Sequence, residues 1–359
     1  MSNRFDFEGL INRSKRFSRD EFVANFGGIV EDVSAMLASD LSRKAIAEAR
    51  EYIESKGEEL LPNQMPRLQR YDFGNLESAS ELLDGKVAAV DGTPVLPLQK
   101  YSFGQALCVG IGSRSYVRPL EDVLHGYTTQ AIVRGLSHEK SEDMKAFFTQ
   151  LEEEIAGISL TAYMRYFESV HALEISEPYI FCDGTLIYQW LSNIEIGRNL
   201  YKKLLKEKKV IGVIKSLKES VLLSWLGRAL KSGEVFFAQT FYEHVERQST
   251  AQQREIQWLN DQEFVQEAKQ IWRGVFKPRQ KAFGFEVHLD HIAPMLRIMV
   301  ADCQMNHLGH EIPFLLNTVD KEIRNFFKSK VLQTQIAAQL SDLSENIFFE
   351  EMEERLFRE

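Results

Sequence analysis

The chain has 359 residues, of which 44% are apolar and 26% are charged, and its net charge is −9. This composition is typical of a globular protein with ample core material, and the length suits one core domain with helical additions. No stretch approaches 18 consecutive apolar residues, and the basic segment 1–20 lacks the apolar centre of a secretory signal. The charge argues against broad nonspecific attraction to nucleic acid but permits a local basic patch.

The N-terminal part is predicted to be a helical arm followed by a linker. Apolar side chains recur three and four residues apart over residues 19–57, which indicates an amphipathic helix. We therefore expect a helical arm over 1–60 and a Pro- and Gly-containing linker over 61–85. Because the arm is too apolar for a solvent-exposed segment, we expect it to pack against a second subunit or a partner. The alternative is that it folds back on its own core.

The elements that follow are predicted from apolar periodicity. In chain order we expect strands over 86–91, 101–112 and 126–134, a helix over 141–173, a strand from 179 to Asp183, a helix over 191–209 and a strand over 210–214. A mostly helical region over 217–273, paired strands over 282–289 and 293–301, and an amphipathic helix over 314–328 complete the series. Three strands, a helix, a strand, a helix, a strand and a late helix are the order of the ribonuclease H-like fold. We therefore predict an α/β fold with a ribonuclease H-like mixed sheet flanked by helices.

The cysteines predict no disulfide framework and no metal site. Cys108, Cys182 and Cys303 are scattered, and none belongs to a Cys-x-x-Cys motif. The first two lie in apolar strands, where a cysteine is most often a small core residue. A reducing cytoplasm is the expected location.

Two predicted strands end in the same tripeptide, Asp-Gly-Thr, at Asp91 and at Asp183. A buried apolar run that stops at glycine holds the preceding aspartate on a rigid strand and presents it at the open end. Ligands of parallel sheets bind at the carboxyl ends of the strands. Two such carboxylates suit a divalent-metal site for phosphodiester chemistry, although two turn aspartates would leave the same pattern.

Two metal ions about 4 Å apart need three or four carboxylates, so further acids must complete the site. Glu168 is the preferred candidate in the helix before Asp183, because it lies on a largely apolar stretch, and Glu154 is the next. The late helix offers Asp320, which would otherwise be a surface acid of an amphipathic helix.

A basic run follows the second aspartate strand. Residues 198–218 contain eight lysines and arginines: Arg198, Lys202, Lys203, Lys206, Lys208, Lys209, Lys215 and Lys218. Lys202, Lys203, Lys206 and Lys215 are the candidates for contacts with nucleic-acid phosphates, and the alternative is a solvated helix face. The aromatic residues Tyr101, Phe103 and Trp190 could stack on single-stranded bases, but core packing is the commoner role.

The histidine pairs His288/His291 and His307/His310 give little support for structural zinc. Residues three apart on a strand face opposite sides, the second pair flanks a glycine turn, and no cysteine lies nearby. Asp290-His291 is interpreted as a substrate contact or a turn.

Together these motifs resemble the NurA family of DNA-end-processing nucleases over residues 87–324. The matching segments are Val90-Asp91-Gly92-Thr93, Cys182-Asp183-Gly184-Thr185-Leu186 and Lys215-Ser216, followed by Gly309 and Pro313. The family commonly has histidine seven residues after this proline, where this chain has Asp320. The resemblance identifies residues 86–330 as a nuclease domain, with a helical insertion at about 217–280 and a C-terminal helical tail over 331–359.

The resemblance also implies an activity and partners. It implies manganese- or magnesium-dependent cleavage of DNA by two metal ions at Asp91, Glu168, Asp183 and Asp320. It further implies a homodimer that works with a HerA-type hexameric ATPase in DNA repair or phage defence. One alternative is a catalytically degenerate nuclease fold that acts as an adaptor for an ATPase ring. A haloacid-dehalogenase-like phosphatase would need Asp-x-Asp-Gly-Thr, but Ala89 and Phe181 stand where its nucleophile should be.

Overall fold

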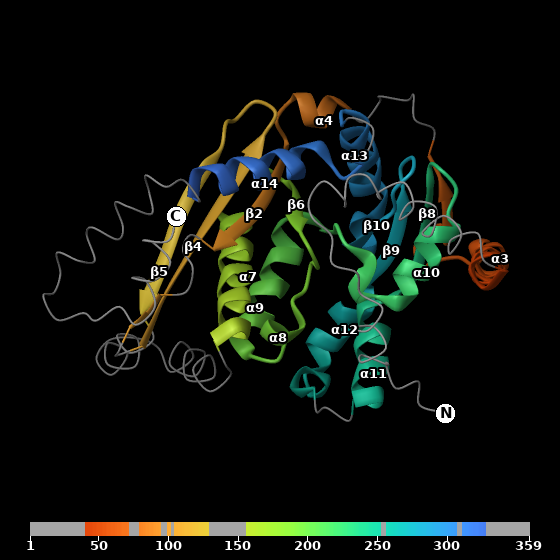
Figure 1. Ribbon diagram of the computed structural model, residues 1–359, viewed down its shortest axis with the longest axis horizontal. Helices are drawn as coiled ribbons and strands as arrows, with labels where there is room; N and C mark the ends of the chain where they lie inside the picture. Colours follow the sequence, from red (N-terminus) through yellow and green to blue (C-terminus); the bar gives the residue numbers. More distant parts are fainter. Residues whose placement is uncertain are drawn as a thin grey trace, which may run out of the picture.

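The computed structural model describes residues 40–71, 79–94, 99–101, 104–128, 156–252, 256–306 and 311–327. In this part of the chain, ten strands form one sheet with helices on both faces (Figure 1). The strands are β1 (Leu68–Arg70), β2 (Val87–Pro94), β3 (Gln99–Tyr101), β4 (Gly104–Ser115), β5 (Glu121–Thr128), β6 (Tyr179–Asp183), β7 (Lys209–Ile214), β8 (Glu234–Thr240), β9 (Ile271–Lys277) and β10 (Phe283–His288). The helices are α3 (Asp40–Gly57), α4 (Ala79–Leu83), α7 (Ala156–Glu174), α8 (Gln189–Ser192), α9 (Glu195–Glu207), α10 (Val221–Ala229), α11 (Phe241–Gln252), α12 (Gln262–Gln270), α13 (Ile292–Gln304) and α14 (Phe314–Phe327), with short 3-10 turns η1 (Leu217–Glu219), η2 (Gln257–Asn260) and η3 (Leu289–His291).

The centre of the sheet is parallel and the rest is antiparallel. Its order is β1-β8-β9-β10-β7-β6-β2-β4-β3, and β5 also pairs with β4. β2 runs parallel to β6, and β6 runs parallel to β7. The meander β2-β4-β5, the helix α7, the strand β6, the helix α9 and the strand β7 follow one another in the ribonuclease H-like order. The predicted fold class is confirmed, and β10, β9, β8 and β1 extend its sheet by four antiparallel strands.

Alternate residues of β2 show how the two faces are covered. Val87 and Ala89 belong to the core beneath α13 and α14, whereas Ala88 and Val90 belong to the core on the α7 and α9 side. Successive side chains of a strand point to opposite faces, so a strand buried on both faces is apolar throughout. Figure 1 shows α13 and α14 on one side of the sheet and α7, α8 and α9 on the other.

The predicted helical insertion, residues 217–280, also contributes two strands to the sheet. It forms α10, α11 and α12, but β8 lies between α10 and α11, and β9 follows α12. β8 is buried along its whole length, and six of the seven residues of β9 are buried. Short apolar runs between amphipathic segments have no periodicity that separates strand from helix, which is why the sequence pattern missed both strands.

The segment 293–301 was predicted as a strand, and this prediction was wrong. It lies in α13, in which nine residues are buried. A helix covered on most of its surface is apolar almost continuously, so it resembles a buried strand over a short window. The partner strand predicted over 282–289 is present as β10.

The described part of the N-terminal arm packs on its own chain. Ala49 and Ile53 of α3 are buried in one cluster with Leu223 and Leu226 of α10. The described part of the predicted linker holds α4 and also β1, which pairs with β8. Residues 19–39 and the C-terminal tail 331–359 lie outside the described residues, so the division into arm, linker, nuclease domain and tail remains a prediction. None of the described helices combines the length and apolarity needed to span a membrane.

Candidate functional site

Asp91 and Asp183 lie side by side where the parallel pairing of β2 and β6 ends. Asp183 is the last residue of β6, whereas β2 continues past Asp91 to Pro94. The pairing of Val90 with Cys182 places the next residue of each strand at the same edge of the sheet. Gly184 follows with φ +78, a left-handed backbone conformation that favours glycine, and its N–H donates to the Val213 carbonyl at 2.8 Å. The turn therefore ends β6 directly behind Asp183.

Glu168 reaches the same edge from the α7 face of the sheet. A Cβ atom at Gly92 would lie 2.7 Å from Glu168 Oε1 and 2.7 Å from Met164 Cγ, so the helix can approach only because residue 92 has no side chain. Arg165, one turn earlier in α7, pairs with Glu168 Oε2 at 2.7 Å and donates to the main-chain carbonyl of Asp183. The helix and the end of β6 are thereby joined.

Asp320 enters from α14, on the opposite face of the sheet. It meets Lys215, the first residue after β7, whose Nζ lies 3.0 Å from Asp183 Oδ2. The same ammonium is 3.4 Å from Asp320 Oδ2 and 3.9 Å from Asp91 Oδ2. On its other side, Asp320 Oδ1 lies 2.6 Å from Nε of Arg324. Three of the four predicted carboxylates therefore surround one ammonium group.

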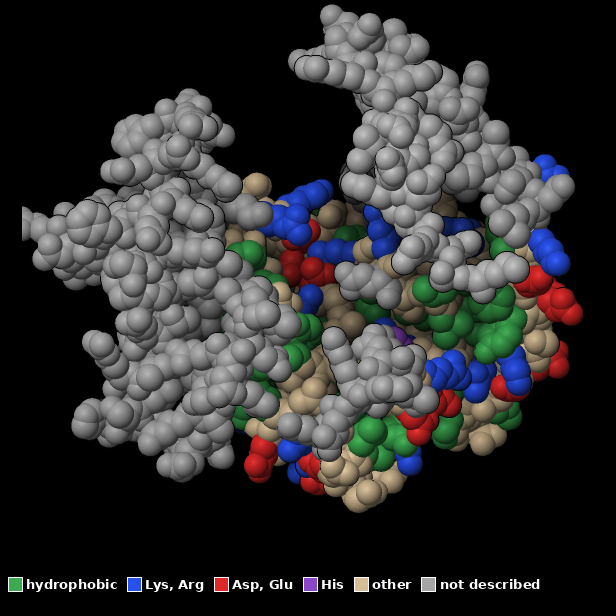
Figure 2. All heavy atoms as spheres, turned by 60° about the horizontal axis from the view of Figure 1, so that its bottom comes forward, with side chains coloured by type: hydrophobic (Ala, Val, Ile, Leu, Met, Phe, Trp, Pro, Cys, Tyr) green, Lys and Arg blue, Asp and Glu red, His purple; other side chains and the backbone are tan. Residues whose placement is uncertain are grey.

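The crowding of like charges perturbs the buried groups. Burial raises the pKa of Asp91 well above its usual range, and the charge of Asp183 raises it further. Burial also raises the pKa of Glu168, although Arg165 opposes the shift. Burial alone would lower the pKa of Lys215, but the three aspartates around it outweigh that effect and raise it. On the face that Figure 2 presents, acidic side chains gather in a hollow among lysine and arginine side chains.

The donor atoms fit a hard divalent cation. All four carboxylates offer oxygen, the ligand that magnesium and manganese prefer. Glu168 Oε1 is buried and has no hydrogen-bond partner within the described residues. Within the same residues, no three side chains among His, Cys, Asp and Glu stand in an arrangement that could itself hold a metal ion. The three aspartates instead converge on Lys215.

A buried ion pair that sequence reasoning missed supports the loop after Asp183. Glu286 of β10 is fully buried, accepts a hydrogen bond from the Leu186 N–H at 2.9 Å and pairs with Arg273 Nε of β9 at 2.7 Å. A Cβ at Gly212 would lie 2.4 Å from the Leu186 nitrogen, so the loop packs directly on β7. The only indication of this ion pair in the sequence was a single glutamate, Glu286, within the otherwise largely apolar segment 283–288.

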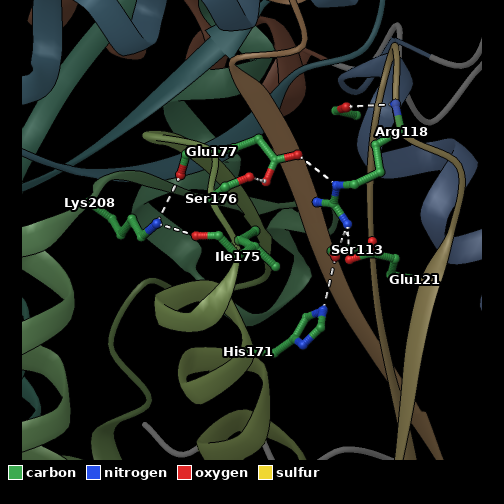
Figure 3. Close-up of polar contacts among 9 residues, drawn as sticks. Ser113, Arg118, Glu121, His171, Ile175, Ser176, Glu177 and Lys208 are labelled. Carbon is green, nitrogen blue, oxygen red and sulfur yellow. Dashed lines mark hydrogen bonds and ion pairs between the residues drawn. The ribbon is translucent and has the colours of Figure 1, made fainter.

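A second polar network fixes the far end of α7 (Figure 3). Arg118 pairs with buried Glu177 at 2.8 Å, and His171 of α7 lies 2.9 Å from the Ser113 hydroxyl of β4. Lys208 donates to main-chain carbonyls of the segment between α7 and β6, including that of Glu177 at 3.1 Å. These contacts anchor α7, and with it Arg165 and Glu168, to the amino-terminal ends of the central strands.

The structure brings Lys215 to the carboxylates but engages Lys202 elsewhere. Lys202 pairs with Glu263 of α12 at 2.5 Å, while Lys203 and Lys206 are exposed on α9. α9 ends just before β7 begins, and Lys209 pairs with Tyr179 at the opposite end of β6 from Asp183. Lys206 therefore lies toward the end of β6 and β7 that is opposite the carboxylates, and the predicted phosphate contacts of α9 remain predictions.

The remaining candidates are less informative. Trp190 is half-buried and packs against the core on the α7 side. Asp290 donates its N–H to His288 Nδ1 at 3.3 Å within η3, which agrees with the turn interpretation of this segment. Glu154, Phe103, His307 and His310 lie outside the described residues, as does the side chain of Tyr101.

Comparisons with known proteins complete the description of the site. The sequence matches no protein-family model and no curated protein. The solved NurA nuclease from Sulfolobus solfataricus is similar, with a TM-score of 0.46 and 10% identity over 88% of this chain and 98% of that chain. The structure of NurA bound to dAMP and manganese has a TM-score of 0.40 and 8% identity, over 86% of this chain and 94% of that chain. Endonuclease V from Bacillus subtilis has a TM-score of 0.33 and 11% identity, over 70% of this chain and 82% of that chain.

Proposed function

We propose that this protein is a metal-dependent deoxyribonuclease that hydrolyses phosphodiester bonds and processes DNA ends. The observation that carries the proposal is the meeting of Asp91, Asp183, Glu168 and Asp320 at the point where the parallel pairing of β2 and β6 ends. They come from two strands and from helices on opposite faces of the sheet. Folding places these acids together against their mutual repulsion, which is typical of a site built to bind a cation.

These four carboxylates would hold manganese or magnesium in a two-metal site. When bound, such ions lower the pKa of a water molecule and stabilise the leaving oxygen. Arg165 would act as a positioning residue, because it holds Glu168 and the main chain of Asp183 in one arrangement. Arg324 is 57% exposed beside Asp320, so its guanidinium is available to a substrate phosphate.

The phosphatase alternative finds no support in the site. The positions two residues before Asp91 and Asp183 hold Ala89 and Phe181, both fully buried on the α13 and α14 face. Neither side chain could act as a nucleophile. A HerA-type hexameric ATPase as partner, a homodimer, and a role in DNA repair or phage defence are proposed on the motif resemblance alone.

The deciding experiment is a cleavage assay with the purified full-length chain. End-labelled linear DNA and circular DNA would be incubated with manganese, with magnesium and with EDTA. We expect linear DNA to be degraded only when metal is present. Absence of cleavage under every condition, with or without a HerA-type ATPase, would favour the adaptor function instead.

A further inference from the structure

Lys215 occupies a position that a metal ion would also need. Its ammonium lies within 3.9 Å of carboxylate oxygens from Asp91, Asp183 and Asp320. Each of these aspartates belongs to a different element, so two strands and a helix converge on one cation. The lysine thus acts as a built-in counter-ion for the acidic site.

We infer that Lys215 and a divalent cation compete for the same aspartates, so that metal binding displaces the ammonium from the site. This inference rests on the proposed function. A divalent cation held by oxygens that already contact an ammonium would face strong repulsion at short range. The two cations therefore cannot occupy the site together. When the metal ion binds, the lysine side chain can swing away while its main chain stays in place.

The surroundings of Lys215 permit this movement. Its main chain directly follows the last residue of β7, Ile214, which is paired with Gly284 of β10, so the backbone is fixed. The side chain is a compact charge on a flexible four-carbon stem; its Nζ atom is buried, but 23% of the side chain is exposed, so the stem reaches the surface of the site. Displacement needs only a change of side-chain rotamers.

A displaced Lys215 would also serve the substrate. Arg324 holds the second oxygen of Asp320, so the two cations flank this carboxylate. Once the ammonium has left the aspartates, its charge becomes available beside Arg324 to a phosphate of DNA. The exchange would couple metal loading to phosphate binding, and it explains how a lysine predicted to contact phosphate lies among carboxylates.

The first test compares manganese affinities without DNA. Free manganese would be measured by electron paramagnetic resonance during titration of the wild type and of the Lys215→Met, Lys218→Met and Asp91→Asn variants. Lys215→Met removes the competing charge but keeps the length of the side chain, so we expect at least tenfold tighter binding. Lys218 is an exposed lysine in η1, so Lys218→Met is the matched control and should bind manganese as the wild type does.

The second test uses the wild type only, so it does not depend on the folding of a variant. Lysines would be acylated briefly with and without manganese, and labelling at Lys215 and Lys218 would be measured by mass spectrometry. We expect manganese to increase labelling at Lys215 severalfold and to leave Lys218 unchanged.

The outcomes separate this inference from the proposed function. If the wild type binds manganese, Asp91→Asn does not, and Lys215→Met binds no more tightly than the wild type, competition is refuted while the nuclease proposal stands. Unchanged labelling of Lys215 in the metal-bound wild type would refute it equally. If neither the wild type nor Lys215→Met binds manganese, the proposed metal-dependent function fails, and this inference fails with it.

Discussion

Charge balance governs the behaviour of single residues at this site. Two unit charges 4 Å apart interact by about 4 kcal/mol at an effective dielectric constant of 20, so adjacent carboxylates need nearby cations. Lys215, Arg165 and Arg324 supply three positive charges for the four acids. The raised pKa values of Asp91 and Glu168 show that these cations compensate the burial of the acids only in part.

The first prediction concerns the two strand aspartates. Asp91→Asn and Asp183→Asn keep the side-chain shape but remove the charge that would hold the cation. We expect each to reduce manganese-dependent cleavage at least about a hundredfold, since even partners of metal ligands cost 10- to 100-fold. Circular dichroism should show an unchanged fold, and Asp122→Asn, an exposed acid of β5, serves as the control. Cleavage at the wild-type rate by either variant would contradict the site assignment.

The second prediction concerns the approach of α7 to β2. In Gly92→Ala the new methyl group would press against Glu168 Oε1 and also lie 2.9 Å from Ile111 Cδ1. We expect a loss of about 1–3 kcal/mol in unfolding free energy and at least a tenfold loss of cleavage, because the carboxylate must move. In Gly284→Ala, a matched glycine of the same sheet, the nearest neighbour is 3.2 Å away. Equal cleavage by the two variants would show that the position of Glu168 is not critical.

At the scale of elements, the start of α14 depends on a buried acid. Asp302 of α13 accepts a hydrogen bond from the Leu315 N–H at 3.0 Å and from the Tyr116 hydroxyl at 2.7 Å. The carboxyl is fully buried, and burial raises its pKa to about 7. Since α14 carries Asp320, the protonation of Asp302 acts on the helix that completes the site.

The third prediction follows from this raised pKa. Between about pH 4 and pH 7 the unfolded chain has released the Asp302 proton while the folded chain retains it, so this group makes unfolding easier as pH rises. Asp302→Asn removes that dependence. We expect the melting temperature of the variant, relative to the wild type, to increase from pH 4.5 to pH 8. The exposed-site control Asp290→Asn should show a constant difference in melting temperature from the wild type. The same constant difference for Asp302→Asn between pH 4.5 and pH 8 would refute the raised pKa of Asp302.

The fourth prediction concerns the ion pair beneath the β6–α8 loop. Glu286→Gln keeps an acceptor for the Leu186 N–H but leaves the Arg273 charge buried without its partner. Breaking a buried pair in this way costs about 3–5 kcal/mol. Adding Arg273→Met should recover part of that loss, because no uncompensated charge then remains. Urea unfolding of the two single variants and the double variant would measure the coupling energy between Glu286 and Arg273. Strictly additive losses of unfolding free energy would contradict this ion pair.

The central elements were predictable because their signals are local. β2, β6 and β7 each contain an apolar run that stops at Asp-Gly or at Lys-Ser, and these dipeptides mark the site. They also mark the ends of β6 and β7, whereas β2 continues to Pro94. The pairing of Glu286 with Arg273 was not predictable, because it joins neighbouring strands through a register that only the folded hairpin defines. The position of Lys215 among three aspartates likewise depends on α14 crossing the opposite face, which no spacing along the chain reveals.

At the scale of the whole molecule, α3 belongs to the folded body. Its Arg50 pairs with the buried Glu234 of β8 at 2.5 Å, and its Ala45 carbonyl accepts a hydrogen bond from Trp225 Nε1 at 3.0 Å. Together with Ala49 and Ile53, these contacts cover the β8 and α10 end of the sheet. The buried face of α3 is therefore covered within this chain, and the predicted role of the arm in assembly remains a prediction.

The last prediction separates these two parts of the arm by truncation. Deleting residues 1–57 removes the buried side chains of α3 and leaves Glu234 without Arg50, so we expect the melting temperature to fall by about 10 °C or more. Deleting residues 1–39 spares these contacts and should leave the melting temperature near that of the full chain. If residues 19–39 pack against a second subunit or the ATPase, light scattering should show that this shorter truncation has lost the assembly formed by the full chain. A shorter truncation that is still dimeric and still binds the ATPase would refute that role for the arm, and the nuclease site would be unaffected.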